Sequence, residues 1–159
     1  RPRLLILDEP TNGVDPVSRR DFWEILYELA GDGMTVLVTT AYLDEAERCG
    51  RVGLMHRGRL IRCGTPAELT GSAGAACYKV RTPDPRAARA HLAGAAGVAS
   101  VQPFGADLHV FLSPSPASAE ALAAELERSG LGPASFVRTE PSLEDVFILY
   151  IRQAIAEAA

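Results

Sequence analysis

The sequence predicts an α/β fold, with part of a parallel sheet first and a smaller α+β domain after it. Two short apolar runs, Leu4–Leu7 and Met34–Val38, have the continuous hydrophobicity of strands that are buried on both faces of a parallel sheet. The amphipathic stretch between them predicts the helix that connects two parallel strands. Beyond residue 71 the apolar segments follow the order βαββαβ, which indicates a second, separate sheet.

The segment after the first strand carries the signals that begin and end a helix. Asp15 is a suitable N-cap and Pro16 fits the first helical position. Gly31-Asp32-Gly33 is expected to stop this helix. Its predicted apolar face consists of Phe22, Trp23, Ile25, Leu26 and Leu29.

The first domain is expected to continue to residue 71 with shorter elements. A short helix is predicted over 41–48, and two strands over 51–56 and 59–63, joined by a hairpin turn at Arg57-Gly58. A further helix is expected to begin after Thr65. Thr65 would be its N-cap and Glu68 would complete a capping box.

A stretch of small residues at 72–77 predicts a linker between this domain, residues 1–71, and an accessory domain, residues 78–159. The second domain has the element order of a ferredoxin-like, split-βαβ unit. Its elements are expected to be strands over 77–81, 98–104, 108–112 and 134–139, with helices over 85–92, 118–129 and from Ser142 to the end. The sequence indicates no catalytic cluster in this half, so a structural or regulatory role is predicted for it.

Composition excludes several classes of protein. The chain has 159 residues, of which 47% are hydrophobic, and a formal charge of -4, which fits one domain or two small ones with a real core. This mild acidity gives no support to a nucleic-acid partner. No apolar run approaches the length of a membrane span, and no signal peptide is recognisable. The three cysteines and three histidines are scattered, which predicts neither a disulfide nor a zinc site.

Asp8 and Glu9 are the first candidates for chemistry. They follow the predicted strand directly, and open α/β sheets bind their ligands at the carboxyl ends of their strands. Two adjacent carboxylates repel each other unless a cation or a proton compensates them, so a Mg²⁺-nucleotide site is the first hypothesis. The alternative is a buried strand that ends in a polar turn at Pro10.

Three motifs in order resemble the nucleotide-binding subunits of ABC transporters. Leu4–Pro10 is similar to the Walker B motif with its trailing Glu, Asn12–Asp15 to the D-loop, and Thr39–Ala41 to the switch loop, or H-loop. The segment Pro141–Phe147 resembles a motif near the end of drug- and polysaccharide-exporter ATPase subunits. Ser142 and Asp145 there predict a capped helix start that serves docking and not chemistry.

This resemblance implies a fold and a set of roles. The first domain would be the C-terminal part of a P-loop NTPase core of the ABC ATPase type, with ATP and Mg²⁺ as cofactors. Asp8 would hold Mg²⁺, often through water, and Glu9 would orient or activate the hydrolytic water. Asn12, Gly13 and Asp15 would form the loop that reaches a partner subunit, although Asp15 also has the simpler role of an N-cap.

Ala41 departs from the family pattern, which has His at this position in contact with the γ-phosphate. An alanine side chain can neither donate a hydrogen bond nor carry charge. Two interpretations stay open: a slow or degenerate site that works beside an active one, or a subfamily that hydrolyses ATP through Glu9 alone.

The phosphate loop and the signature loop of the family do not occur in this sequence. We therefore expect a C-terminal fragment of a longer polypeptide, and no measurable ATP affinity for residues 1–159 alone, because the backbone cradle and lysine that bind phosphates are missing.

The resemblance implies an ATP-hydrolysing subunit that powers export of a drug, lipid or polysaccharide. Its expected partners are an integral-membrane permease and a second nucleotide-binding domain, in a homodimer or heterodimer, with no nucleic acid. The expected location is the cytoplasm, peripheral to the inner face of the cell membrane. Alternatives are a soluble ABC-type ATPase, a degenerate nucleotide-binding half with a regulatory role, and a regulatory module whose second half binds a small ligand or a partner.

Overall fold

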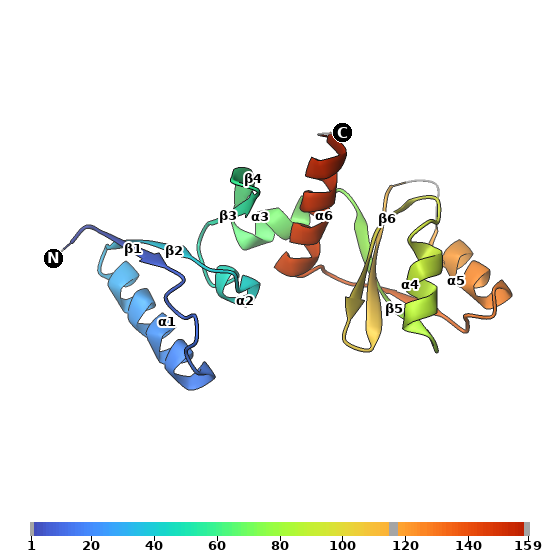
Figure 1. Ribbon diagram of the computed structural model, residues 1–159, viewed down its shortest axis with the longest axis horizontal. Helices are drawn as coiled ribbons and strands as arrows, with labels where there is room; N and C mark the ends of the chain where they lie inside the picture. The colour runs from blue at the N-terminus through green and yellow to red at the C-terminus, as the bar shows by residue number, and fades with distance from the viewer. Residues whose placement is uncertain (1, 115–117, 158–159) are drawn as a thin grey trace. The chain divides into compact units, whose positions relative to one another are not determined.

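A computed structural model describes residues 2–114 and 118–157 of the chain. The chain divides into two compact units, residues 1–48 and 49–159, each of which has its own internal packing (Figure 1). The elements of the first unit are β1 (Leu4–Asp8), α1 (Pro16–Gly31), β2 (Thr35–Thr39) and α2 (Leu43–Ala46). Those of the second are β3 (Val52–His56), β4 (Arg59–Gly64), α3 (Pro66–Gly71), β5 (Ala76–Arg81), α4 (Pro85–Leu92), β6 (Val98–Phe104), β7 (Asp107–Leu112), α5 (Ala119–Arg128), β8 (Ser135–Arg138) and α6 (Leu143–Glu157).

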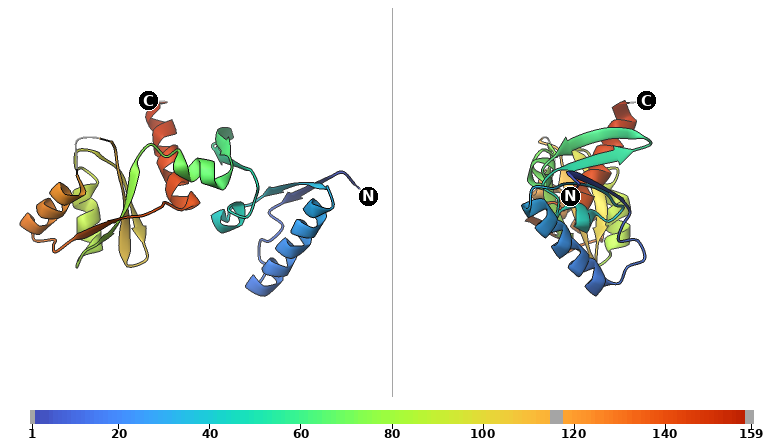
Figure 2. Two further views of the ribbon diagram at one scale, coloured as in Figure 1. Left: turned by 180° about the vertical axis from the view of Figure 1, so that it is seen from behind. Right: turned by 90° about the vertical axis from the view of Figure 1, so that its left-hand side faces the viewer.

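In the first unit, β1 and β2 pair in parallel, and α1 lies along one face of the pair (Figure 2). Leu5 pairs with Val36 and Leu7 with Val38, and all four side chains are half-buried. Because the side chains of a strand alternate between its faces, these four form a single apolar row.

The prediction that both strands are buried on both faces is wrong for this unit. Ile6 and Leu37 pair with each other on the other face and are 63% and 54% exposed. No described element of the unit covers them. The predicted apolar face of α1 is also too wide, because Trp23 and Leu26 are buried while Ile25 is 54% exposed. A helix that packs on a pair of strands buries only a narrow stripe.

The predicted N-cap and end of the first helix are confirmed by α1, which runs from Pro16 to Gly31. Asp15 is its N-cap, with a carboxylate oxygen that accepts hydrogen bonds from the main-chain N–H groups of Val17 and Ser18 at 3.0 and 3.1 Å. The second helix is shorter than the predicted 41–48. The Thr40 hydroxyl accepts the Tyr42 N–H at 3.0 Å, which forms a turn before the helix begins.

The second unit begins with the predicted hairpin of β3 and β4. Arg57 and Gly58 form its turn with φ values of 48° and 74°, both in the left-handed region that a two-residue turn of this kind requires. The capping box is confirmed: Thr65 N–H donates to Glu68 at 2.8 Å, and Glu68 N–H donates to the Thr65 hydroxyl at 3.1 Å.

The remaining strands form an antiparallel, four-stranded sheet in the order β6-β7-β5-β8. The elements from β5 to β8 follow one another as the sequence predicts. Figures 1 and 2 show α4 and α5 on one face of this sheet and α6 on the opposite face. The buried core between the sheet and α4 and α5 consists of Val80, Ala88, Leu92, Val101, Leu108, Val110, Leu112, Ala119, Leu122 and Leu126.

The start of α6 is fixed to the sheet by buried polar groups. Ser142 and Asp145 form the predicted reciprocal cap, at 2.9 Å from Ser142 N–H to the carboxylate and 3.2 Å from Asp145 N–H to the hydroxyl. His109 Nδ1 lies 2.8 Å from the same carboxylate, and both side chains are 5% exposed. Gln102 Nε2 donates to the Asp145 carbonyl at 2.9 Å. The predicted helix reaches residues 158 and 159, which lie outside the described residues.

Further along, α6 contacts α3, which explains where the second unit begins. The Tyr150 hydroxyl donates to the Leu69 carbonyl at 2.7 Å and lies 2.9 Å from the Ser72 hydroxyl. Through this helix the hairpin and α3 pack with the four-stranded sheet, so the division between compact units falls before residue 49, earlier in the chain than the predicted linker at 72–77.

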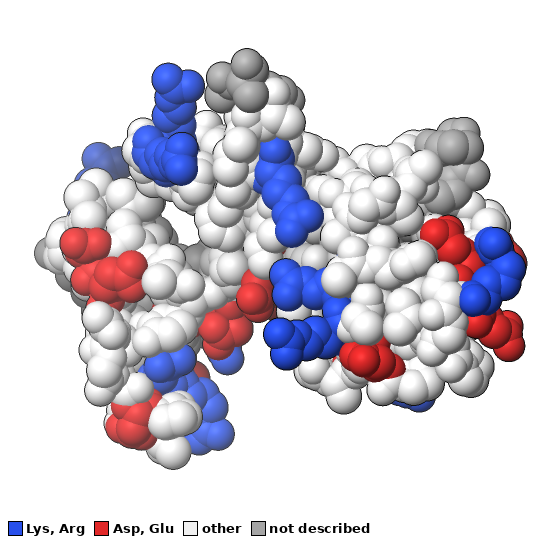
Figure 3. Space-filling model, turned by 45° about the vertical axis from the view of Figure 1, so that its right-hand side comes forward, with Lys and Arg blue, Asp and Glu red and all other residues white. Residues whose placement is uncertain are grey.

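The surface mixes both charge signs, as the face drawn in Figure 3 shows. None of the three cysteines forms a disulfide; Cys77 is buried, and this burial, together with the neighbouring Asp145, raises the pKa of its thiol to about 12. In the described part of the chain, no helix has the length and apolarity that crossing a membrane requires.

Candidate functional site

The acid pair lies where β1 and β2 end side by side. Asp8 pairs with Thr39 in the parallel register, and the Thr39 hydroxyl donates a hydrogen bond to the Asp8 carboxylate. The Glu9 N–H lies 3.1 Å from both the carbonyl and the hydroxyl oxygen of Thr39. Both carboxylates therefore lie at the carboxyl end of β1, beside the end of the parallel strand β2, at the edge where α/β sheets bind ligands.

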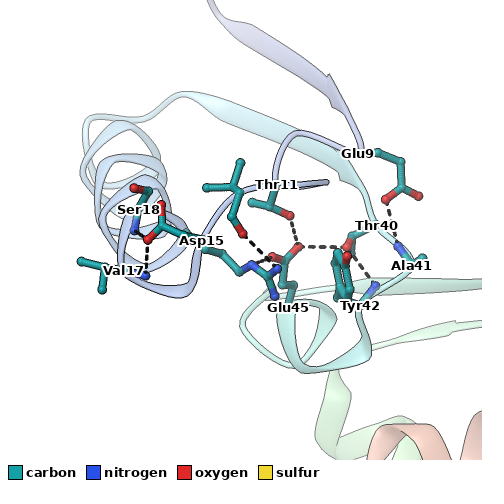
Figure 4. A network of polar contacts seen from close by, with 11 residues as sticks. Glu9, Thr11, Asp15, Val17, Ser18, Thr40, Ala41, Tyr42 and Glu45 are labelled. Atoms are coloured by element: carbon teal, nitrogen blue, oxygen red, sulfur yellow. Dashed lines mark hydrogen bonds and ion pairs between the residues drawn. The ribbon is translucent and has the colours of Figure 1, made fainter.

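Glu9 and Ala41 are brought together although 32 positions separate them. The Ala41 N–H donates to the Glu9 carboxylate, with 3.2 Å between nitrogen and oxygen (Figure 4). Glu9 has a φ of 46°, a left-handed conformation that costs a residue with a Cβ about 1 kcal/mol. Strain of this kind at a carboxylate that faces a second loop is typical of functional positions.

The Ala41 side chain is exposed and offers no polar atom, so the contact with Glu9 uses the main chain alone. A histidine here would keep this N–H and add an imidazole with a donor or acceptor at each ring nitrogen. Ala41 therefore hydrogen-bonds Glu9 through its main chain, but it lacks a side chain that could reach beyond Glu9.

The residues assigned to the D-loop form a tight turn between β1 and α1. Asn12 N–H donates to the Glu9 carbonyl at 3.1 Å, and Val14 N–H donates to the Thr11 carbonyl at 3.1 Å. Gly13 has a φ of 77°, which only glycine adopts without strain. Asp15 ends the turn as the helix cap, and its hydrogen bonds with Ser18 and Val17 lower the pKa of its carboxyl below the ordinary value.

Sequence reasoning missed Glu45, which is fully buried in the same unit. Its Oε2 accepts hydrogen bonds from the hydroxyls of Thr11 and Thr40, each at 2.9 Å (Figure 4). Arg19 Nε lies 3.5 Å from its other oxygen. Glu45 stands between Asp44 and Glu47 on a short segment, so the sequence offered only a run of surface-like acids.

This site can supply one ligand to Mg²⁺, which would need further ligands from water and phosphate. Among the described residues, no cluster of three or more His, Cys, Asp or Glu side chains is close enough to hold a metal ion. Mg²⁺ in nucleotide sites takes one or two carboxylates and completes its coordination with water and phosphate oxygens. The exposed Asp8 carboxylate, oriented by Thr39, suits that limited role.

Comparison with known proteins adds a family to this geometry. Residues 64–151 match the family model of the C-terminal domain of DrrA1-3-like ATP-binding proteins. The chain is 37% identical over 156 residues to the daunorubicin/doxorubicin resistance ATP-binding protein DrrA of Streptomyces peucetius, covering 92% of this chain and 46% of that protein.

Two further relatives have similar descriptions. The Nod factor export ATP-binding protein I of Burkholderia lata is 37% identical over 150 residues, again covering 92% of this chain and 46% of that protein. The probable multidrug ABC transporter ATP-binding protein YbhF of Escherichia coli is 54% identical over 68 residues, which cover 43% of this chain and 12% of that protein. The chain thus spans about half the length of the relatives that it matches most fully.

Proposed function

The chain belongs to the ABC transporter ATP-binding proteins of the drug- and polysaccharide-exporter type, and from this premise we propose that it carries half of an ATP-hydrolysing site that powers export. One observation carries the proposal: Asp8 and Glu9 project from the ends of parallel strands, and Glu9 is held by the Ala41 N–H. A relative named for drug resistance and another named for Nod factor export support an exported drug, lipid or polysaccharide.

Each residue then has a role of its own. Glu9 orients or activates the attacking water, since its carboxylate is fixed at one oxygen and retains the other for a hydrogen bond. Asp8 would hold Mg²⁺ beside the nucleotide. Mg²⁺ and the phosphate loop of the complete protein would supply charge neutralisation for the transferred phosphoryl group. Asn12, Gly13 and Asp15 shape the loop toward a partner subunit.

The same premise extends to fold, partners and location. We assign β1, β2 and α1 to a P-loop ATPase core that extends through residue 71, and residues 78–159 to a ferredoxin-like accessory domain. The partners would be a membrane permease and a second nucleotide-binding domain, and the protein would then lie at the cytoplasmic face of the membrane. The alternatives are a soluble ABC-type ATPase and a degenerate half-site with a regulatory role; Ala41 favours the second of these over the first.

The test is steady-state phosphate release by the full-length protein, assembled with its permease. Glu9→Gln is expected to lower kcat by at least about 100-fold, because it removes the base near the attacking water. Ala41→His is expected to raise kcat, because it restores a side chain that reaches the γ-phosphate. Glu28→Gln, on the exposed side of α1, makes the same chemical change as the first variant and serves as its control.

The two results separate the alternatives. A wild type without phosphate release, in the presence of its permease, would reject the ATPase proposal. A kcat unchanged or lowered by Ala41→His would instead reject the view that this alanine limits turnover, while leaving the role of Glu9 intact.

A further inference from the structure

Two loops of the candidate site meet at one buried carboxylate. Thr11, two positions after Glu9, and Thr40, directly before Ala41, both donate to Oε2 of Glu45 at 2.9 Å. We propose that Glu45 is a positioning residue that couples the turn at 10–15 to the switch loop at 40–42 and thereby sets the distance between Glu9 and Ala41. The proposal rests on the proposed ATPase function for its effect on turnover, but not for its effect on the loops.

A carboxylate suits the chemistry of this contact. A carboxylate oxygen accepts more than one hydrogen bond and donates none, so a single atom can hold two hydroxyl groups. Hydrogen bonds to an ionised acceptor are about twice as strong as neutral ones. Glu45 is fully buried, and Arg19 Nε, 3.5 Å from its other oxygen, compensates the charge that burial would otherwise make costly.

The geometry leaves little independent movement for either loop. Thr40 holds Tyr42 N–H at 3.0 Å through the hydroxyl that also binds Glu45, so the whole segment 40–42 is fixed together. On the other side, Arg19 donates to the Val14 carbonyl at 3.4 Å, and its guanidinium lies 4.5 Å from the centre of the Tyr42 ring. A displacement of the turn at 10–15 therefore changes the setting of Ala41 through Glu45 and Arg19.

This arrangement gives the turn at 10–15 a route to the reacting groups. The proposed role of that turn is contact with a partner subunit. A partner that shifts Thr11 would pull on Glu45, and Glu45 on Thr40, so that the hydrogen bond between Ala41 N–H and Glu9 tightens or loosens with assembly.

The kinetic test compares Glu45→Ala, Glu45→Gln and Asp44→Asn in the full-length protein with its permease. Asp44 is an exposed neighbour on the same short helix, so its variant controls for the local change in charge. Glu45→Ala is expected to lower kcat about 10- to 100-fold with the KM for ATP nearly unchanged. The variant loses the positioning of Glu9 and Ala41, and it loses no contact with the nucleotide. Glu45→Gln, which keeps one oxygen acceptor, should recover part of this loss.

A double-mutant cycle tests the coupling itself. Thr11→Val and Thr40→Val each remove one hydroxyl, and in the wild type each should lower kcat. In the Glu45→Ala background the effect of Thr11→Val should disappear, because the atom that connects the two hydroxyls is gone. The effect of Thr40→Val should shrink to what the loss of its hydrogen bond with the Tyr42 N–H costs. Effects of the two threonine variants that persist undiminished without Glu45 would overturn the proposal.

Hydrogen exchange gives a readout that does not need turnover. Glu45→Ala should speed amide exchange at Ala41 and Tyr42, while amides in the middle of α1 keep their protection. Unchanged protection at Ala41 would overturn the proposal, and so would loss of protection throughout the unit, which indicates a merely structural residue. A wild type that lacks phosphate release would reject the proposed function, whereas the exchange result would still decide the role of Glu45.

Discussion

The two compact units bury their residues in opposite ways. In residues 2–48 the fully buried side chains include the polar pair Thr11 and Glu45, while Ile6 and Leu37 stand more than half exposed on one face of the strands. In the described part of residues 49–159, a four-stranded sheet has helices on both faces, and Leu108, Val110 and Phe111 on its β7 strand are almost completely buried. The unit that carries the candidate site is thus the less completely covered of the two.

This difference indicates which kind of interaction fixes the structure of each unit. The second unit can be stabilised by burial of apolar area, which contributes about 25 cal/mol per Å² removed from water. The first unit has few buried apolar side chains and relies on directed polar contacts around Glu45 and Glu9 to fix its loops. Polar contacts define positions sharply, which suits a site, but they contribute little net stability.

The largest expected contrast comes from one leucine in each unit. Leu108→Ala removes a side chain that is 1% exposed and should lower the free energy of unfolding of the second unit by about 2–5 kcal/mol. Leu37→Ala removes one that is 54% exposed and should cost the first unit less than about 1 kcal/mol, because little buried area is lost. Urea unfolding measures both.

The two units can be followed separately in that experiment. Trp23 is the one tryptophan of the chain and is buried in the first unit, so its fluorescence reports that unit, while far-ultraviolet circular dichroism reports both. Equal losses in the free energy of unfolding for the two leucine variants would contradict this contrast between the units. They would mean that the exposed face of β1 and β2 is covered in solution.

A smaller effect is expected at the polar end of α6. Asp145→Ala removes the reciprocal cap and leaves the buried His109 without its carboxylate, which should cost the second unit about 2 kcal/mol. Glu144→Ala, one residue earlier and exposed, is the matched control. The unfolding midpoint seen by Trp23 fluorescence should stay in place. A shift of that midpoint as large as the shift in circular dichroism would show that the units unfold as one.

The sequence predicted the local features well and the long-range contacts poorly. Helix caps at Asp15, Thr65 and Ser142 and the turn at Arg57-Gly58 depend on neighbouring residues, so short patterns were sufficient. The emergence of Asp8 and Glu9 at the strand ends followed from the apolar run before them.

What could not be predicted joins residues far apart in the chain. Glu45 binds Thr11 across 34 positions, and His109 meets Asp145 across 36. Nothing in the sequence indicates which distant residue each of them contacts, and only the packing of separate elements makes them partners. The exposure of Ile6 was missed for a related reason: hydrophobicity predicts a strand, but the number of its neighbours decides how much of it is buried.

The smallest contrast concerns acid pH. Hydrogen bonds from Arg81 and Lys79 hold the pKa of Asp107 below its ordinary value. Because the folded-state pKa is lower than the unfolded one, this carboxylate stabilises the second unit above its unfolded pKa, and the contribution disappears as the pH falls through the folded value. Asp107→Asn should therefore lower Tm slightly at pH 7 and narrow the difference between Tm at pH 7 and at about pH 3.

Asp15 allows the corresponding experiment in the first unit. Its carboxyl pKa is also lowered, but by helix-start hydrogen bonds instead of by Arg and Lys side chains. Its pKa is lowered by hydrogen bonds with Ser18 and Val17 at the helix start. Asparagine caps a helix about as well as aspartate, so Asp15→Asn should hardly change the Trp23 unfolding transition at pH 7, yet still reduce its dependence on acid pH. If Asp15→Asn lowers Tm at pH 7 more than Asp107→Asn does, then charge at the helix end, and not the hydrogen bonds of the cap, stabilises the turn that leads from Glu9 into α1.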